Sequence, residues 1–235
     1  MIMQPQPHDL LWGITVADLA SPVPDWVKEV VQRGDPVVMR RAVTHRGMIP
    51  VGIRGVERYQ RYKLEMPSQQ IKKIMKPEQL CQLELEHFPH LAKQLQRVQQ
   101  TMKMLPWVWG YTGSVGFELA TGIQTVTENS DIDLLIRTEG FLTKDEAKQL
   151  LHQLEQTELK LDVQLQTPKG GVALKEWART TGKVLLKRND GAVLVNNPWQ
   201  ERDDGMSSIW VYPGQGAQKV NMLSDLPQTN LVQHY

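Results

Sequence analysis

A glycine–serine pair, followed further along the chain by two aspartates in an apolar strand, is the feature that most constrains the fold. The stretch 111–138 reads YTGSVGFELATGIQTVTENSDIDLLIRT, in which a single isoleucine separates Asp131 from Asp133. A buried carboxylate is costly unless another group neutralises it. The two aspartates therefore either lie at a solvated strand edge or bind a cation.

Hydrophobic periodicity and turn residues predict alternating helices and strands around this stretch. The run 90–104 has apolar residues at helical spacing, and LKLDVQLQ at 159–166 alternates with the period of a strand. The predicted elements are a helix at 90–104, a strand at 107–112, a short helix from Gly113 to Ala120 that stops at Gly122, a strand at 131–137, a helix opened by the capping box of Thr143 and Glu146, a strand at 159–166, a helix at 172–179, and a hairpin of VLLKR and AVLV.

The aspartates have the chemistry of a magnesium or manganese site. The period of a strand puts Asp131 and Asp133 on one face, with their Cα atoms about 6–7 Å apart. A third carboxylate, Asp162, lies on the polar face of the strand at 159–166 and could join them. Ligand sets made only of oxygen favour Mg²⁺ or Mn²⁺ over zinc.

The glycine–serine pair supplies the second half of a possible phosphate site. A helix N-terminus presents free amide groups and a partial positive charge, both of which suit a phosphate. Gly113 lets the backbone approach a ligand closely, and the hydroxyl of Ser114 adds a donor. A metal ion held by carboxylates beside a phosphate-binding turn is the arrangement that enzymes of phosphoryl or nucleotidyl transfer use.

The first part of the chain reads as a smaller, basic module. Strands are predicted at 36–41 (PVVMRR) and 49–53 (IPVGI). From Arg33 to Lys76 there are eleven lysines or arginines against three acids. This segment is either a solvated basic face or a surface for a polyanion or an acidic protein.

The composition of the whole chain excludes several classes of protein. A net charge of +1 does not commit the molecule to nucleic acid or to a membrane, and the single cysteine, Cys81, excludes a disulfide framework. No apolar run approaches the length of a membrane span, and the first residues lack the pattern of a signal peptide. We therefore expect a cytoplasmic protein that binds neither nucleic acid nor membrane.

The order of these motifs resembles a known architecture. A strand, a Gly-Ser turn, a short helix, an Asp-x-Asp strand, a helix and a third aspartate in a strand resemble the nucleotidyltransferase fold of the polymerase-beta type. Over residues 8–200 the chain resembles, more narrowly, the phosphoribosyl-dephospho-CoA transferases, which are the holo-acyl-carrier-protein synthases of malonate decarboxylase. The motifs that carry this resemblance are HDLLWG at 8–13, PVVMRR at 36–41, IPVGIRGVERYQR at 49–61, the block GS–ELATG–SDIDLLI, and PW at 198–199.

The resemblance implies a specific reaction. The 2′-(5″-phosphoribosyl)-3′-dephospho-CoA group would pass from its triphosphate donor, triphosphoribosyl-dephospho-CoA, to a serine of the apo acyl carrier protein of malonate decarboxylase, releasing diphosphate. Mg²⁺ or Mn²⁺ on Asp131 and Asp133 would orient the triphosphate, and Asp162 would be a metal ligand or accept the serine proton. Arginines that could grip the triphosphate or the acidic carrier protein, or could equally be structural, are Arg40, Arg41, Arg54 and Arg58.

The residues alone leave two other functions open. A metal centre recognises the phosphates of a substrate and not the group attached to them. A nucleotidyltransferase that adenylylates another protein or a small molecule is therefore an alternative. A non-catalytic module that binds a nucleotide or a carrier protein is a second alternative. The simultaneous presence of Asp131, Asp133 and Asp162 favours an enzyme over this second alternative.

We expect an α/β (α+β) protein with a small mixed N-terminal module and a nucleotidyltransferase-like catalytic module. The predicted boundaries are 1–88 for the basic module and 89–205 for the catalytic module. Residues 206–235 begin with methionine and contain YPGQGAQ, which resembles the N-terminus of a malonyl-CoA acyltransferase. No G-x-S-x-G nucleophile motif follows in this chain. We therefore interpret residues 206–235 as a tail from a foreign or run-on coding segment.

Overall fold

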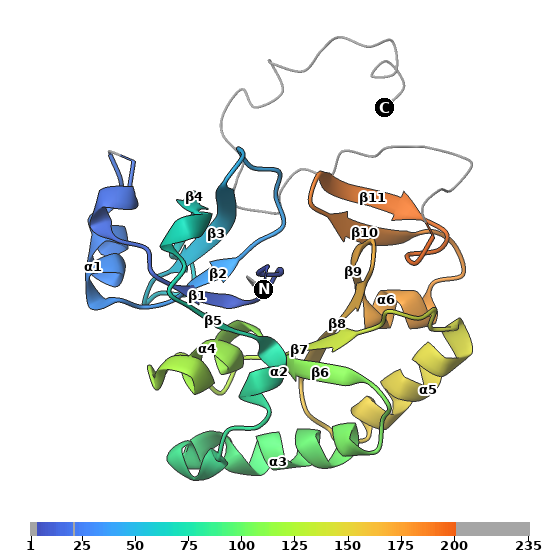
Figure 1. Cartoon of the computed structure of the whole chain (residues 1–235). Coiled ribbons are helices and arrows are strands. Elements are labelled where there is room, and N and C mark those ends of the chain that lie inside the picture. The colour runs from blue at the N-terminus through green and yellow to red at the C-terminus, as the bar shows by residue number, and fades with distance from the viewer. Residues whose placement is uncertain (1–3, 21, 201–235) are drawn as a thin grey trace, which may run out of the picture.

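The computed structural model describes residues 4–20 and 22–200, and these residues form two β-sheets with helices packed around them (Figure 1). Helices and mixed or antiparallel strands together confirm the predicted α+β class. The interpretation of residues 206–235 as a foreign tail concerns a segment that lies outside the described residues.

The N-terminal sheet is antiparallel and has the strand order β4-β3-β2-β1-β5. Helix α1 contributes three buried valines to the core beneath this sheet. The predicted strands at 36–41 and 49–53 correspond to β2 and β3, whereas the sequence patterns missed the other strands and α1. The elements are β1 (Leu10–Trp12), the 3₁₀ helix η1 (Val16–Asp18), α1 (Asp25–Arg33), β2 (Val37–Met39), β3 (Met48–Arg54), β4 (Arg61–Pro67), the 3₁₀ helix η2 (Ser68–Gln70) and β5 (Lys73–Met75).

The C-terminal sheet has the order β11-β10-β9-β8-β7-β6, in which β7 and β8 are parallel and the other pairs are antiparallel. Helices α3 and α5 lie on the side of this sheet that faces away from the N-terminal sheet (Figure 1). The elements are α2 (Pro77–Leu80), the 3₁₀ helix η3 (Leu85–His87), α3 (Pro89–Lys103), β6 (Val108–Tyr111), α4 (Gly113–Thr121), β7 (Ile132–Arg137), α5 (Lys144–Glu155), β8 (Leu161–Thr167), β9 (Gly170–Ala173), α6 (Leu174–Arg179), β10 (Val184–Arg188) and β11 (Gly191–Val195).

Local sequence signals explain where several of these elements begin and end. The capping box predicted at the start of α5 is confirmed, because the amide of Glu146 donates to the hydroxyl of Thr143 at 3.2 Å and the Glu146 carboxylate accepts from the Thr143 amide at 2.8 Å. Helix α4 ends at Gly122, whose φ of 74° is left-handed, as predicted. No helix within 4–20 and 22–200 has the length and apolar character needed to cross a membrane.

Two details of the predicted elements were wrong. Residues 172 and 173 belong to β9 rather than to the following helix, because a hairpin at Gly170 pairs Val172 with Leu165 of β8. This pairing overrides the helical spacing of the apolar residues. Asp131 lies one residue before β7 instead of inside the strand.

The two halves meet across the polar face of the C-terminal sheet. Arg137 at the end of β7 binds both carboxylate oxygens of Glu78 at 2.7 and 3.0 Å and the side chain of Gln6 at 2.8 Å. Leu80 and Leu85, which precede residue 89 in the chain, belong to the core of the second sheet. The boundary at residue 88 stays a prediction.

Asp9 is a buried carboxylate near this junction, and its ionisation makes the stability of the fold depend on pH. The residue is 0% exposed, and its Oδ1 is the one buried side-chain oxygen or nitrogen without a hydrogen-bond partner among the described residues. Its Oδ2 accepts from the Gln6 amide at 2.9 Å. Burial, which outweighs the opposing hydrogen bond from Gln6, raises the pKa of Asp9 to about 6.

We expect Asp9→Asn to increase the free energy of unfolding above pH 6. A carboxyl group whose pKa is higher in the folded state favours folding most at low pH, and this contribution is lost as the pH rises from the unfolded value through about 6. Urea unfolding between pH 4 and pH 8 measures the effect, and Asp25→Asn, on an exposed side chain, is the control. A variant less stable than wild type at pH 8 would contradict a raised pKa of Asp9 in the folded state.

Candidate active site

The turn between β6 and α4 forms one wall of the candidate site. Gly113 has a φ of +61°, and a Cβ at this position would overlap the carboxylate of Asp133. The amide of Thr112 donates to the backbone oxygen of Asp133 at 3.0 Å, which fixes the turn against β7. The first amides of α4 have no partner within the helix, so this end of the helix can donate to an anion.

The three predicted carboxylates lie at the start of the neighbouring parallel strands β7 and β8. Asp133 of β7 is paired in register with Asp162 of the parallel strand β8, and Asp131 lies two residues before Asp133. Neighbouring strands are about 4.8 Å apart, so the side chains of a register pair share one face of the sheet at close range. Asp133 is half-buried, whereas Asp131 and Asp162 are exposed.

The electrostatics of Asp133 are those of a crowded acidic group. Burial raises its pKa to about 6, with further contributions from the carboxylates of Asp162 and Asp131. Arg54 and Arg58 oppose this rise without cancelling it. The sheet therefore brings the three carboxylates within electrostatic range, and Arg54 and Arg58 compensate their mutual repulsion only in part.

The donor set fits a hard divalent cation in its chemistry. All three groups are carboxylates, which Mg²⁺ and Mn²⁺ prefer, and a cation would relieve the repulsion that adds to the effect of burial on the pKa of Asp133. The side chains as they stand do not converge into a coordination shell, since residues 4–20 and 22–200 contain no group of three His, Cys, Asp or Glu residues placed to hold a metal ion. Metal binding at Asp131, Asp133 and Asp162 thus stays a prediction.

The N-terminal sheet contributes a positively charged side chain to the candidate site. Arg54, the last residue of β3, donates from Nη2 to the hydroxyl oxygen of Ser114 at 2.6 Å. Its guanidinium lies over the ring of Phe117, 5.6 Å from the ring centroid. Burial lowers the pKa of Arg54 to about 10, and the charge of Asp133 acts in the opposite direction. Arg54 and Ser114, both predicted as binding residues, thus contact each other although they are 60 positions apart.

The other predicted arginines occupy different places. Arg58 lies in the exposed β3–β4 connection and acts electrostatically on Asp133. Arg41 hydrogen-bonds to Gln166 at the far end of β8. The stem of Arg40 packs on Gly52 of β3, in the N-terminal sheet. The structure therefore groups Arg54 and Arg58 with the aspartates, and it places Arg41 and Arg40 elsewhere.

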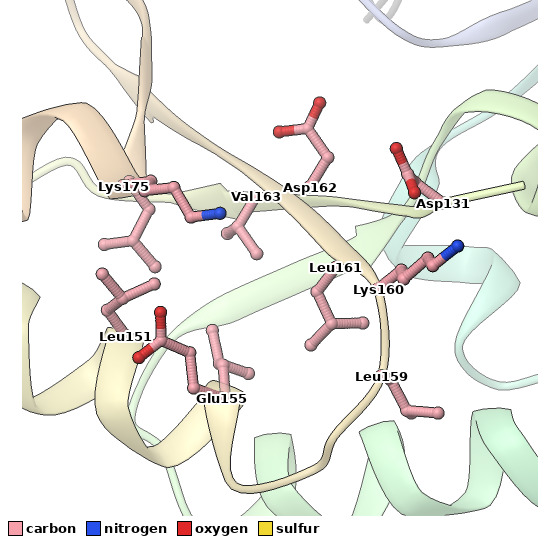
Figure 2. Close-up of a pocket in the computed structure, with 11 residues that line it drawn as sticks. Asp131, Leu151, Glu155, Leu159, Lys160, Leu161, Asp162, Val163 and Lys175 are labelled. Atoms are coloured by element: carbon pink, nitrogen blue, oxygen red, sulfur yellow. The ribbon is translucent and has the colours of Figure 1, made fainter.

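A pocket of about 360 Å³ is lined by Asp131 and Asp162 together with residues of α5, β8 and α6. Figure 2 shows aliphatic side chains from α5 and β8 lining it, with the carboxylates of Asp131 and Asp162 at its upper edge pointing away from them. The lysines Lys160 and Lys175 lie in the same lining. The pocket could hold an apolar portion of a ligand whose charged portion reaches the carboxylates.

Several residues around the site were not predicted as functional. Phe117 supports the Arg54 guanidinium, and the buried Glu118 accepts from the amides of Thr125 and Val126 at 2.9 and 2.8 Å, which anchors the loop after α4. His8 reaches β8 through Gln164, with 3.0 Å between the two Nε2 atoms. The position of His8 in the HDLLWG motif was the only available signal for it.

Carboxylates on neighbouring strands beside a helix N-terminus and an arginine form an arrangement suited to transfer of a phosphorylated group. Comparison with known proteins specifies the class. The family model for the phosphoribosyl-dephospho-CoA transferase MdcG C-terminal domain matches residues 79–198, and the model for the MdcG N-terminal domain matches residues 6–77. The chain belongs to the phosphoribosyl-dephospho-CoA transferase family, and it is a transferase.

Curated relatives support this assignment over most of their length. A phosphoribosyl-dephospho-CoA transferase from Pseudomonas fluorescens is 42% identical over 84% of this chain and 95% of its own. Relatives of the same name from Azotobacter vinelandii and Pseudomonas aeruginosa are 43% and 40% identical, over 84% and 83% of this chain and 95% and 94% of theirs. No solved structure matches the chain, so the predicted likeness to the polymerase-beta-type nucleotidyltransferase fold rests on the order of elements and motifs.

We expect Gly113→Ala to abolish most transfer activity, because the added methyl group would displace the carboxylate of Asp133. Gly122→Ala is the matched control. Gly122 also has a left-handed φ, of +74°, but nothing lies within 4 Å of a Cβ added there. Both variants should lose about 1–2 kcal/mol of stability from backbone strain, measured by urea unfolding. Equal activity losses in the two folded variants would contradict a specific role for the contact between Gly113 and Asp133.

Proposed function

We propose that the protein transfers the 2′-(5″-phosphoribosyl)-3′-dephospho-CoA group from its triphosphate donor to a serine of the apo acyl carrier protein of malonate decarboxylase. The observation that supports this most directly is the carboxylate of Asp133 held against the N-terminus of α4 and in register with Asp162. The relatives are named phosphoribosyl-dephospho-CoA transferases, and this name supports the choice of the transferred group.

Each element of the site has a task in this reaction. The free amides of α4 and the Arg54 guanidinium bind the triphosphate. Asp131 and Asp133 would hold Mg²⁺ or Mn²⁺, and the ion would neutralise negative charge on the triphosphate. Asp162 is a third ligand or accepts the proton of the carrier serine, which attacks the α-phosphorus in line. The bond from the α-phosphorus to the bridging oxygen breaks, and diphosphate leaves.

The exposed connection between β3 and β4 is suited to receive the carrier protein. Val56 and Tyr59 are each 81% exposed there, and Arg58 and Arg61 flank Tyr59. Exposed aromatic and arginine side chains often dominate the energy of protein interfaces. Arg58 also acts electrostatically on Asp133, so a partner docked on this connection would lie beside the reacting groups.

The decisive experiment is an intact-mass assay of the apo carrier protein with triphosphoribosyl-dephospho-CoA and, in a separate reaction, with ATP. We expect a mass increase equal to the phosphoribosyl-dephospho-CoA group in the first reaction and none in the second. Substitution of Asp131 or Asp133 should prevent most of the mass increase in the first reaction. Addition of an adenylyl group in the second reaction alone would favour the adenylylating alternative, and no modification in either would contradict the proposed function.

We expect Asp131→Asn and Asp133→Asn each to lower the transfer rate by at least about a hundredfold, equivalent to about 2.7 kcal/mol. An amide is a poor ligand for a hard cation, so the triphosphate loses its electrostatic clamp. Mg²⁺ should raise the melting temperature of the wild type but not of Asp133→Asn. Metal-free Asp133→Asn should be at least as stable as wild type above pH 6, since ionising Asp133 opposes folding there. Near wild-type turnover in folded Asp133→Asn would contradict the metal assignment.

Docking on the β3–β4 connection predicts a salt-sensitive association with the carrier protein. Arg61→Glu should slow association, and Tyr59→Ala should weaken the carrier affinity at least about tenfold, in the range typical of interface hot spots. The control is Lys28→Glu on α1, which reverses an exposed charge outside this connection. Surface plasmon resonance at two salt concentrations measures both effects. Carrier affinity that is independent of salt and of Tyr59 would place the docking face elsewhere.

A further inference from the structure

A second charged cluster lies on the same polar face of the C-terminal sheet, further along β8 from the aspartates. Its members are His8, Arg41, Gln164, Gln166 and Lys187, and we call them the cationic cluster. The cluster contains two permanent cations and three neutral polar groups but no acidic residue.

Strand register places two members of the cluster, Gln166 and Lys187, in one row across the sheet. Arg137 of β7 is paired with Gln166 of β8, Gln166 with Gly171 of β9, and Gly171 with Lys187 of β10. Paired residues share a face of the sheet, and Asp162 lies on that face because it is four residues before Gln166. At about 3.3 Å per residue, the row lies about 13 Å along β8 from Asp162.

The N-terminal half of the chain delivers the other two members. Arg41 donates from Nη2 to the side-chain oxygen of Gln166. The Gln164 amide donates to Nε2 of His8 at 3.0 Å, so the imidazole acts as an acceptor. Gly171 makes room for both contacts, since a Cβ there would lie 2.5 Å from the Gln164 side chain and 3.2 Å from the Arg41 guanidinium.

The backbone at His8 is strained in a way that aims its ring at the sheet. His8 has a φ of 78°, one of two non-glycine residues with positive φ in the described part of the chain. The conformation is held by a bond from its amide to the Met39 oxygen and by one from the Met39 amide to the Asp9 oxygen, each 2.9 Å. Such strain is typical of functional sites.

Among the described residues, the positive charge of the cluster has no acidic counterpart. None of the ion pairs among the described residues involves Arg41 or Lys187, and Arg137 already binds Glu78. Burial lowers the pKa of Arg41 to about 10, and burial together with Arg41 and Lys187 lowers that of His8 to about 4. A half-buried guanidinium without an anion is costly, so an anionic ligand would be strongly favoured here.

We infer that the cationic cluster is a second phosphate subsite, which binds the diphosphate of the dephospho-CoA half of the donor while the N-terminus of α4 binds the triphosphate. This inference rests on the proposed function. The donor has a phosphate group at each end of two linked ribose rings, and the polar face of the sheet presents two anion-binding regions separated along one strand. The subsite would fix the orientation of the donor and select against triphosphates that lack the second phosphate group.

Binding measurements with two separate probes test the subsite without any transfer step. Dephospho-CoA contains the diphosphate but no triphosphate. Inorganic tripolyphosphate, used with Mg²⁺, represents the triphosphate and lacks the dephospho-CoA half. We expect Arg41→Gln to weaken dephospho-CoA binding at least about tenfold, equivalent to about 1.4 kcal/mol, and Lys187→Gln to weaken it several-fold. Both variants should bind tripolyphosphate as wild type does, and Arg54→Gln should show the opposite selectivity.

Arg188→Gln is the matched control, because Arg188 follows Lys187 on β10 and its guanidinium binds Asp190 at 2.9 and 2.5 Å. It should leave both affinities unchanged. Lys187 is exposed, so Lys187→Gln still tests the subsite if Arg41→Gln fails to fold. Unchanged dephospho-CoA affinity in folded variants, or equal losses for the two probes, would overturn the inference.

The same measurements separate the subsite from the proposed function. Loss of dephospho-CoA affinity in Arg41→Gln supports the subsite even if the wild-type protein modifies no carrier protein in the intact-mass assay. If the wild-type protein modifies the carrier protein but Arg41→Gln and Lys187→Gln bind dephospho-CoA as tightly as wild type does, the proposed function is supported and the subsite is overturned.

Discussion

The contact between Asp133 and Gly113 is the constraint on which the candidate site depends. The backbone of Asp133 accepts from Thr112, and its side chain fills the space that a Cβ of residue 113 would need. This contact fixes the first turn of α4 against β7, and the parallel pairing of β7 with β8 then adds Asp162. A glycine with left-handed backbone, a strand register and a helix N-terminus therefore form one unit, in which none can shift without moving the carboxylate.

Much of this unit could be predicted from sequence because its signals are local. An apolar run identified β7, alternating apolar residues identified β8, the capping box located the start of α5, and Gly122 marked the end of α4. Each of these depends on residues within one or two turns of one another. The placement of Asp133 and Asp162 on one face also followed from periodicity, since both side chains stand opposite apolar residues that pack into the core.

The contributions of the N-terminal half could not be predicted in the same way. The strands β1 and β5 have only three residues each and are stabilised by pairing with distant partners rather than by their own sequence. The contact of Arg54 with Ser114 spans 60 positions, and that of Arg41 with Gln166 spans 125. Basic composition indicated that this segment was unusual, but only the fold separates the arginine beside the aspartates from the one at the far end of β8.

The resulting polar face has opposite charges at its two ends, and their separation explains why neither end neutralises the other. About 13 Å separates Asp162 from the row that Arg41 contacts, and this distance exceeds the Debye length of about 8 Å at physiological salt. Asp162 is exposed, so solvent and ions screen part of the attraction between Asp162 and Arg41. Each end therefore keeps its own unfavourable electrostatics, which appear as the raised pKa of Asp133 and the lowered pKa of Arg41. A protein selected only for stability would remove such groups or pair them. Their presence on one sheet is the expected arrangement when binding of the ligand, rather than folding, supplies the missing counter-charges.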